Sequence, residues 1–133
     1  MANATIEMKI SLNRIILFGK EIDKLKNFYL ENFGFSLLEE IRDQWVVLKA
    51  GQIEIALHKI GRQYDSDEIF RAASNTKLVF GVNGDLEATR NKLISNGVLL
   101  QDIKSFEGVN ALFCDGEDPE GNIFQLQQQL SSF

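Results

Sequence analysis

The chain has 133 residues, of which 44% are hydrophobic and 25% are charged, and this composition is typical of one globular domain. Its formal net charge of −5, without any cluster of Lys and Arg, argues against a protein that binds nucleic acid. No apolar run is long enough to span a membrane, and residues 1–4 lack the basic and then apolar pattern of a signal peptide. The single cysteine, Cys114, excludes an internal disulfide and a cysteine-rich zinc site. We therefore expect a cytoplasmic protein with no membrane and no nucleic-acid partner.

The first half of the chain predicts one strand, one helix and three more strands. An apolar cluster indicates a strand over 10–18, and an apolar stripe at helical spacing indicates a helix over 21–33 that ends at Gly34. Three short strands should follow, over 35–41, 44–49 and 52–59.

A polar connection over 60–75 separates the two halves of the chain. Asp65 and Glu68 have the spacing of a capping box, which predicts one short helix there. The order then repeats, with a strand over 76–82, a helix over 85–96 closed by Gly97, and strands over 98–104, 109–114 and 122–128.

This order is an internal repeat of two modules, about 10–59 and 76–128. The distance from Arg14 to Gly34 equals the distance from Lys77 to Gly97. A module of four strands and one helix has one sheet face covered and one bare. Two such modules side by side leave a concave face, which suits a small ligand better than a macromolecule.

The end of the second module carries the most distinctive local pattern. Residues 118–122 read Asp-Pro-Glu-Gly-Asn, in which the only proline fixes φ and Gly121 tolerates a positive φ. Residues 123–127 alternate, so a strand follows the turn with Gln125 on one face and Phe124 and Leu126 on the other. Gln125 therefore needs a polar or wet face to point into.

The paired βαβββ order, Phe28-Tyr29 in the first helix and the turn at 118–122 together resemble the vicinal oxygen chelate superfamily. That superfamily holds glyoxalase I, the bleomycin- and fosfomycin-resistance proteins and the extradiol dioxygenases. The resemblance covers about residues 10–128. It implies a single α+β domain over 1–133, with two βαβββ modules in tandem forming an open, cup-shaped mixed sheet and the helices outside. Because members of this fold often pair, it also implies a homodimer.

The resemblance also implies where a metal would lie. Members that use a divalent ion hold it at the centre of the cup with His, Gln or Glu side chains from the first and last strands of each module. The matching positions here are Arg14, Ala56, Lys77 and Gln125. Two cations, a methyl group and an amide are not a ligand set for a divalent ion, so we expect the fold without the metal centre and without a cofactor.

Two further residues could change that expectation. Glu54 and His58 share a strand face with Ala56, and with Gln125 they could hold an ion, although Lys77 would oppose it. Alternatively His58, the only histidine, is a strand-end residue near the surface.

A more specific hypothesis concerns the partners of Arg14 and Lys77. If both point into the cup, two positive charges converge and need either a carboxylate or a bound anion. One alternative is a pocket for an anionic or carbonyl-bearing small molecule. Arg14 would donate two parallel hydrogen bonds to this ligand, Lys77 would supply a point charge and Gln125 would add a neutral hydrogen bond. The other is an internal ion pair between Arg14 and Glu54. Both alternatives stay open.

Aromatic and acidic residues complete the set of candidates. Trp45, the lone tryptophan, could line the cup and stack on a flat ligand, or it could pack in the core. Tyr64 and Phe70 could cover the mouth of the cup or pack in a dimer contact. The acidic run 115–118 is expected to be a solvated loop and not a calcium site.

Three functions remain open on these grounds. The first is a metal-free small-molecule binder. The second is a divergent lyase, isomerase or dioxygenase that uses a divalent metal, or Glu54 or His58 as a general base. The third is a structural or interaction role in which side chains fill the cup. No phosphate-binding loop, dinucleotide fingerprint or serine-nucleophile motif is present in the sequence.

Overall fold

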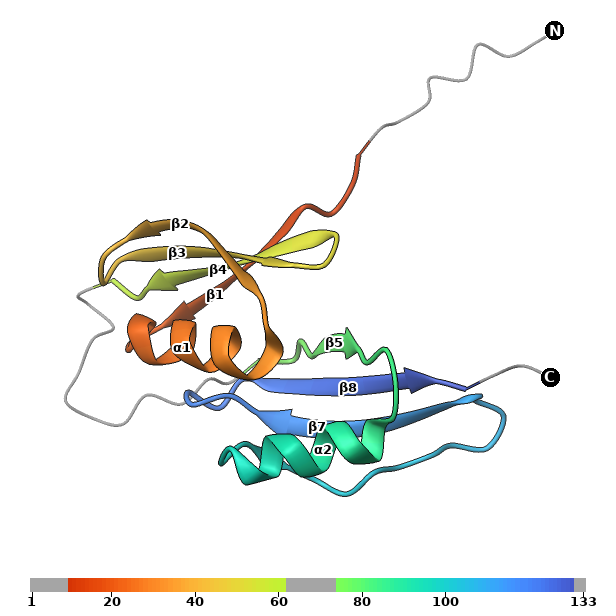
Figure 1. The fold of residues 1–133 in the computed structure, drawn as a ribbon. Coiled ribbons are helices and arrows are strands. Elements are labelled where there is room, and N and C mark those ends of the chain that lie inside the picture. Colours follow the sequence, from red (N-terminus) through yellow and green to blue (C-terminus); the bar gives the residue numbers. More distant parts are fainter. Residues whose placement is uncertain (1–9, 62–73, 131–133) are drawn as a thin grey trace, which may run out of the picture.

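The computed structural model describes residues 10–61 and 74–130, and it confirms the tandem βαβββ order (Figure 1). The first module contains β1 (Arg14–Gly19), α1 (Ile22–Phe33), β2 (Ser36–Ile41), β3 (Trp45–Ala50) and β4 (Ile53–Lys59). The second module contains β5 (Leu78–Gly81), α2 (Leu86–Ser95), β6 (Leu99–Leu100), β7 (Ala111–Glu117) and β8 (Ile123–Gln129).

Each module forms its own four-stranded mixed sheet. Sheet A has the order β1-β4-β3-β2, and sheet B has the order β5-β8-β7-β6. The β1–β4 and β5–β8 pairs are parallel, and the other pairs are antiparallel. Among the described strands no pair joins sheet A to sheet B, so the architecture is open and β1 and β5 are both edge strands.

The ends of both helices lie within one residue of the ends predicted for them. Helix α1 buries Ile22, Leu25 and Tyr29, which fall on one side at helical spacing. It ends at Gly34, whose φ of 69° is the left-handed conformation that glycine adopts without a steric penalty. Neither helix in the described ranges is long and apolar enough to cross a membrane.

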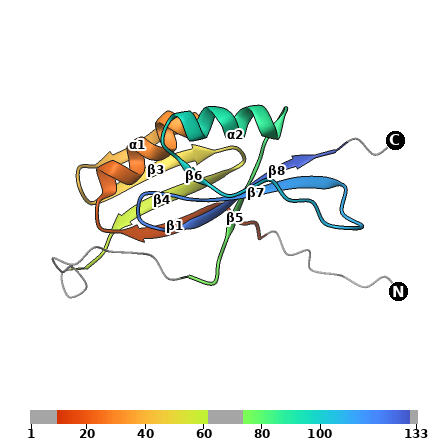
Figure 2. The ribbon, with the colours of Figure 1, turned by 90° about the horizontal axis from the view of Figure 1, so that it is seen from below.

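A shared aromatic core joins the two modules. The ring of Phe33 in α1 lies 5.0 Å from that of Phe80 in β5 and 5.2 Å from that of Phe124 in β8. Tyr29 lies 6.4 Å from Phe80. Both helices lie on one side of the molecule (Figure 2). The side of each sheet that faces this core is therefore covered, and we call the opposite side its outer face.

The turn at 118–122 ties the second module to the first through Asp118, of which only 4% is exposed. Its carboxylate accepts hydrogen bonds from the hydroxyl of Tyr29 at 2.7 Å, from the backbone N–H groups of Glu120 and Asn122, and from the Asn122 side chain. Burial, and then the Asp118 charge, raise the pKa of Tyr29, so the hydroxyl remains a donor. The expectation that residues 115–118 form a solvated loop is wrong for Asp118, because folding places four donors around it.

Glu120 makes the second tie between the modules and is 3% exposed. Its two carboxylate oxygens accept the backbone N–H groups of Lys20 and Glu21, both at 2.7 Å, just before α1 begins. A carboxylate at this place satisfies free N–H groups and complements the helix dipole.

Three predicted strands are at least three residues shorter than expected. The strand predicted over 76–82 is limited to β5 (Leu78–Gly81). The strand predicted over 10–18 begins at Arg14, and Ile10 and Leu12 are exposed. The strand predicted over 98–104 is reduced to Leu99–Leu100. The Leu100–Gly116 pair and the next bridge, Lys104–Phe113, differ by one residue in register, so an extra residue interrupts the ladder. The capping box at Asp65 and Glu68 lies outside the described residues.

Candidate functional site

The outer face of sheet A carries most of the residues selected from the sequence. The alternate residues of its strands fill the core, so their neighbours must point outward. Register then places Arg14 beside Glu54, and Phe18, His58 and Trp45 in one row across β1, β4 and β3.

Arg14 and Glu54 form an ion pair at one end of this face. Nε and Nη2 of Arg14 donate to Oε1 of Glu54 at 3.0 and 2.7 Å. The guanidinium carbon also lies 5.5 Å from the centre of the Trp45 ring, within the range of a cation–π contact. Of the two alternatives for Arg14, this chain adopts the internal pair, and the pair leaves 38% of Arg14 and 35% of Glu54 exposed.

An aromatic row crosses the other end of the face. The ring of His58 lies 5.3 Å from that of Phe18 and 5.5 Å from that of Trp45, and both contacts are edge-to-face. The indole N–H of Trp45 donates to Oε1 of Glu39 at 3.2 Å. Trp45 therefore lines the outer face and is half-buried, and the exposed His58 is part of the row.

The outer face of sheet B carries a second polar cluster around Asp115. Nζ of Lys77 lies 3.1 Å from Oδ2 of Asp115, and Nε2 of Gln125 donates to Oδ1 at 3.0 Å. Burial by itself would raise the pKa of Asp115, but the hydrogen bonds from Lys77 and Gln125 outweigh it and hold this pKa below its ordinary value. Gln125 thus meets the polar face that its place in an apolar strand requires.

The sequence patterns do not single out Asp115, because they predict a loop over 115–118. In the structure β7 runs on to Glu117, and Asp115 lies directly opposite Gln125. The signal was the alternation in the strand itself, because Leu112 and Cys114 face the core and the residue after Cys114 must point outward.

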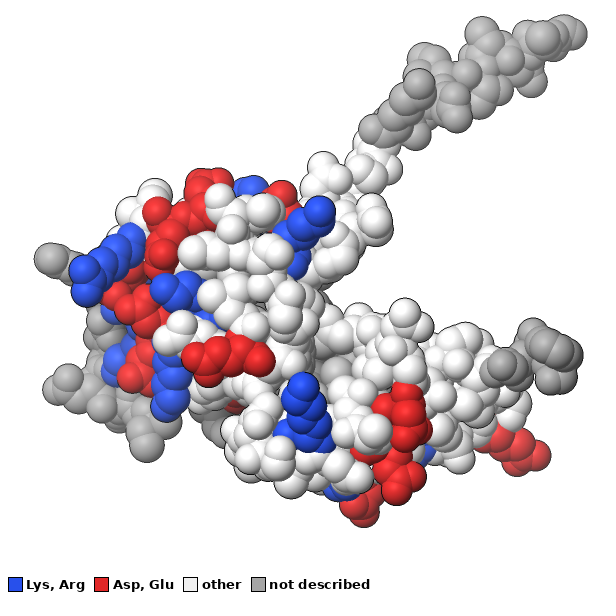
Figure 3. Space-filling model, viewed as in Figure 1, with Lys and Arg blue, Asp and Glu red and all other residues white. Residues whose placement is uncertain are grey.

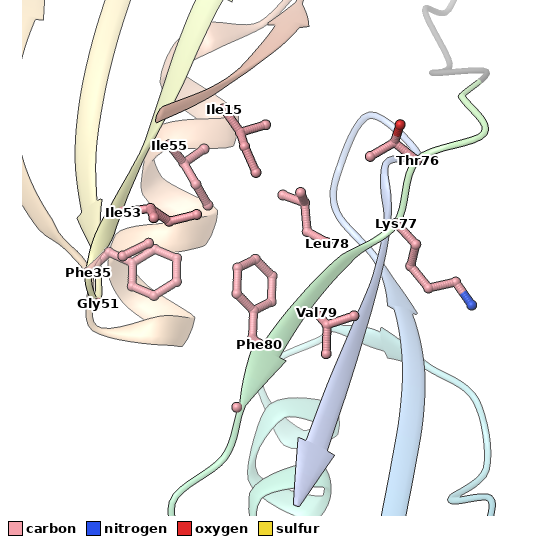
Figure 4. Close-up of a pocket in the computed structure, with 12 residues that line it drawn as sticks. Ile15, Phe35, Gly51, Ile53, Ile55, Thr76, Lys77, Leu78, Val79 and Phe80 are labelled. Atoms are coloured by element: carbon pink, nitrogen blue, oxygen red, sulfur yellow. The ribbon is translucent and has the colours of Figure 1, made fainter. Parts of the chain in front are cut away.

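Among the described residues no contact joins Arg14 to Lys77 within one chain, and their convergence on a single cavity stays a prediction. Each cation has its own carboxylate partner on its own sheet. In Figure 4 Lys77 points away from Ile15 and Ile55 of sheet A. The two clusters are therefore separate half-sites within one chain.

An apolar crevice of about 440 Å³ separates the two modules beside β1 and β5. Figure 4 shows the side chains of Ile15 and Ile55 pointing across it toward Leu78 and Phe80. Figure 3 shows the same notch from outside, with walls that are mostly uncharged. Core-side residues of both sheets form most of its lining, and beside β5 the lining also includes Lys77 of the polar cluster on sheet B.

The residues at the expected metal positions do not fit a divalent ion. Ala56 offers no donor atom and is fully buried, and both Arg14 and Lys77 are cations held in ion pairs. Within 10–61 and 74–130, no three His, Cys, Asp or Glu side chains gather as a metal site would need. Tyr64 and Phe70, expected near the mouth of the cup, lie outside the described residues.

Solved structures with the same fold include enzymes and binding proteins. Lactoylglutathione lyase from Agrobacterium tumefaciens superposes with a TM-score of 0.69 at 16% identity, covering 92% of this chain and 96% of that one. The fosfomycin resistance protein FosX from Listeria monocytogenes gives 0.73 at 13% identity, covering 91% and 94%. The antibiotic-binding protein TnmS3 from Streptomyces sp. CB03234 gives 0.70 at 22% identity, covering 92% and 99%. These similarities show the shared fold, and no curated protein sequence matches the chain.

The match at the level of the family is extensive. Residues 11–126 match the family of the glyoxalase/bleomycin resistance protein/dioxygenase superfamily. That range contains both βαβββ modules nearly complete, as well as the turn at 118–122. The chain therefore belongs to the glyoxalase/bleomycin resistance protein/dioxygenase superfamily.

Proposed function

We propose that this protein binds a carbonyl-bearing organic small molecule, without a metal centre, in a cup that two copies of the chain complete. The observation that carries the proposal is the edge strand that each sheet presents beside the crevice, β1 in sheet A and β5 in sheet B. Among the described strands, β1 is hydrogen-bonded only to β4, and β5 only to β8. Arg14 begins β1 and Lys77 immediately precedes β5, so both polar clusters lie at these edges.

The two edges favour a second copy of the same chain as their partner. An edge strand presents backbone N–H and C=O groups that can pair with another strand. Ile16 on β1 and Val79 on β5 are 44% and 51% exposed, and the apolar crevice lies between these strands. Contact between copies would cover this apolar surface. With β1 of one copy beside β5 of the other, Arg14 would approach Lys77 of the second copy.

The charges of the two half-sites favour an uncharged ligand over an anion. The sequence favoured an anionic or carbonyl-bearing ligand because two cations without partners would need an anion. Here Glu54 neutralises Arg14 and Asp115 neutralises Lys77. Arg14, Lys77 and Gln125 can still donate hydrogen bonds, and a carbonyl oxygen accepts such bonds.

The alternative of an enzyme with a protein general base gains no support from the geometry. The Glu54 carboxylate is already bound by two N–H groups of Arg14. His58 lies between two aromatic rings, and no described carboxylate orients it. A binding protein therefore fits the arrangement better.

Sedimentation and a thermal-shift screen test the two parts of the proposal. We expect the parent chain to sediment as a dimer and to be stabilised by at least one member of a library of uncharged ketones, esters and amides. Val79→Arg should give a folded monomer that loses this stabilisation, because it places a charge at the edge of β5.

Val109→Arg is the matched control, since Val109 is 49% exposed and lies outside both edge strands. It should remain dimeric and keep the response to the ligand. A monomeric parent, or a Val79→Arg monomer that is stabilised as strongly as the parent, would contradict the proposal. One tightly held divalent metal per chain in elemental analysis would contradict the metal-free part.

A further inference from the structure

We infer that residues 10–13, which we call the arm, add a strand to the edge of β5 in a second copy of the chain. The inference rests on the proposed function, because it names the segment of one copy that completes the sheet of the other in the same cup. Three observations carry it: an exposed apolar segment, an edge strand without protection, and the directions of the backbone groups on both.

The arm continues β1 in an extended conformation. The backbone N–H of Glu54 donates to the C=O of Asn13 at 2.8 Å, so the ladder between β1 and β4 continues into the arm. The side chains of Ser11 and Asn13 hydrogen-bond each other at 3.0 Å, as neighbours on one face of an extended segment can. Ile10 and Leu12 alternate with them and are 80% and 65% exposed. In Figure 1 this red segment leaves both sheets, so its two apolar side chains gain from contact with another surface.

The edge of β5 lacks the features that usually prevent pairing with another chain. Charged residues, bulges and short length protect edge strands. At the far edge of sheet A, β2 carries Glu39 and Glu40 and a register shift, and at the far edge of sheet B, β6 has only two residues. In contrast, β5 reads Leu-Val-Phe-Gly, and its four residues all line the apolar crevice. The arm reads Ile-Ser-Leu-Asn, so it is uncharged and has the same length as β5.

The backbone groups of both segments point to the open sides of their sheets. The N–H and C=O groups of successive residues in a strand point to opposite sides. Asn13 bonds to β4, so Leu12 presents its N–H and C=O to the open side of β1. The N–H of Val82 donates to Gln127 on β8, so Val79, three residues earlier, presents its own groups to the open side of β5. Leu12 of one copy and Val79 of another can therefore exchange two backbone hydrogen bonds.

An antiparallel register with Leu12 opposite Val79 of the second copy also matches the side chains. Residues directly opposite one another lie on the same face, and these two are 65% and 51% exposed, so they would cover each other. The same register places Ile10 opposite Gly81, and each of the four arm residues then lies opposite one residue of β5. A shift by one residue would turn the apolar side chains of the arm to the other face.

This register also places Arg14 opposite Lys77 of the second copy. Like charges opposite one another destabilise a sheet, but here Glu54 meets the charge of Arg14 and Asp115 meets the charge of Lys77. The arm therefore brings the two polar clusters side by side, as the proposed function requires.

Crosslinking between two separately produced variants tests the contact. One variant carries Leu12→Cys and the other Val79→Cys, both in a Cys114→Ala background that removes the only native thiol. Only a contact between copies can then join the two thiols. Opposite residues of an antiparallel pair have Cα atoms about 5.5 Å apart, which is within reach of a bis-methanethiosulfonate with a short spacer. We expect a covalent dimer from the mixture and none from either variant alone.

The matched control replaces Leu12→Cys by Leu99→Cys, because Leu99 is 64% exposed and lies on β6 at the far edge of sheet B. It should give no covalent dimer with Val79→Cys. Sedimentation gives a second measurement. Leu12→Asp should raise the Kd of the dimer at least about tenfold, since it places a charge in the strand pair, and Leu99→Asp should leave this Kd unchanged. Because Leu12 is exposed, Leu12→Asp should keep the far-UV circular dichroism of the parent.

The outcomes separate this inference from the proposed function. If the parent is a dimer, but Leu12→Cys does not crosslink to Val79→Cys and Leu12→Asp dimerises like the parent, the inference is overturned and the two-copy cup stands. If Leu99→Cys crosslinks to Val79→Cys as fast as Leu12→Cys does, the contact is not specific and the inference is overturned. If the parent sediments as a monomer, the inference and the dimeric part of the proposed function are both overturned.

Discussion

The two modules share one layout but hold the start of their helix in different ways. Helix α2 is capped within its own module, because the Asp85 side chain accepts the Ala88 N–H at 3.2 Å and Gln128 accepts the Leu86 N–H at 2.8 Å. Helix α1 has no such local cap, and Glu21 at its start makes no side-chain capping bond. The N–H groups there are taken by Glu120, about a hundred residues away in the sequence.

The difference means that the first module depends on the second. Tyr29 in the middle of α1 is likewise bound by Asp118 of the second module, across 89 residues of sequence. A repeated layout therefore does not make two independent folding units. The carboxylates of one turn decide whether α1 is held in place, whereas α2 supplies its own cap.

The largest effect should come from Asp118→Ala. The change leaves the buried Tyr29 hydroxyl and the donors of the turn without their acceptor, so we expect a loss of about 3 kcal/mol in the free energy of unfolding. Urea denaturation measures it. Tyr29→Phe removes only one of the four hydrogen bonds and should cost about 1 kcal/mol. If Asp118→Ala lowers the free energy of unfolding by less than about 1 kcal/mol, the turn does not join the modules.

Glu120→Ala should have the next largest effect, about 2 kcal/mol, because two backbone N–H groups at the start of α1 lose their partner. Amide hydrogen exchange should quicken at Lys20 and Glu21 and remain unchanged in α2. Glu107→Ala, which alters an exposed carboxylate in the loop before β7, serves as the control. Equal quickening in both helices would contradict the dependence of one module on the other.

Asp85→Ala is the local counterpart and should cost about 1 kcal/mol, the usual value of one N-cap. Hydrogen exchange should quicken in the first turn of α2 only, since Gln128 still holds the Leu86 N–H. If amide exchange in α1 quickens as much in this variant as in Glu120→Ala, the contrast between the two helices is contradicted.

Lys77→Met should have the smallest effect on the free energy of unfolding, and this effect should depend on pH. The pKa of Asp115 is held below its ordinary value of 3.8, so its ionised form stabilises the folded state above that pH. This contribution is lost as the pH falls from 3.8 through the lowered pKa of the folded state. Because 42% of Lys77 is exposed, we expect a difference of only about 0.5 kcal/mol between parent and variant at pH 7. Urea denaturation at pH 7 and at pH 3 measures this difference. If the difference between parent and variant is larger at pH 3 than at pH 7, the expected dependence on pH is contradicted.

The sequence by itself determined the order of the elements and the ends of the helices. Apolar spacing and the glycines at 34 and 97, both with positive φ, act within a few residues of one another, so they can be recognised without the rest of the fold. The alternation after the turn at 118–122 likewise placed Phe124 and Leu126 in the core and Gln125 on the outer face. The superfamily followed from the same local features in their order.

Only the tertiary structure decided which groups meet. The pairing of Arg14 with Glu54 spans 40 residues, that of Lys77 with Asp115 spans 38, and that of Tyr29 with Asp118 spans 89. Such pairs depend on strand register and on the way that the two modules pack, and no local pattern encodes either.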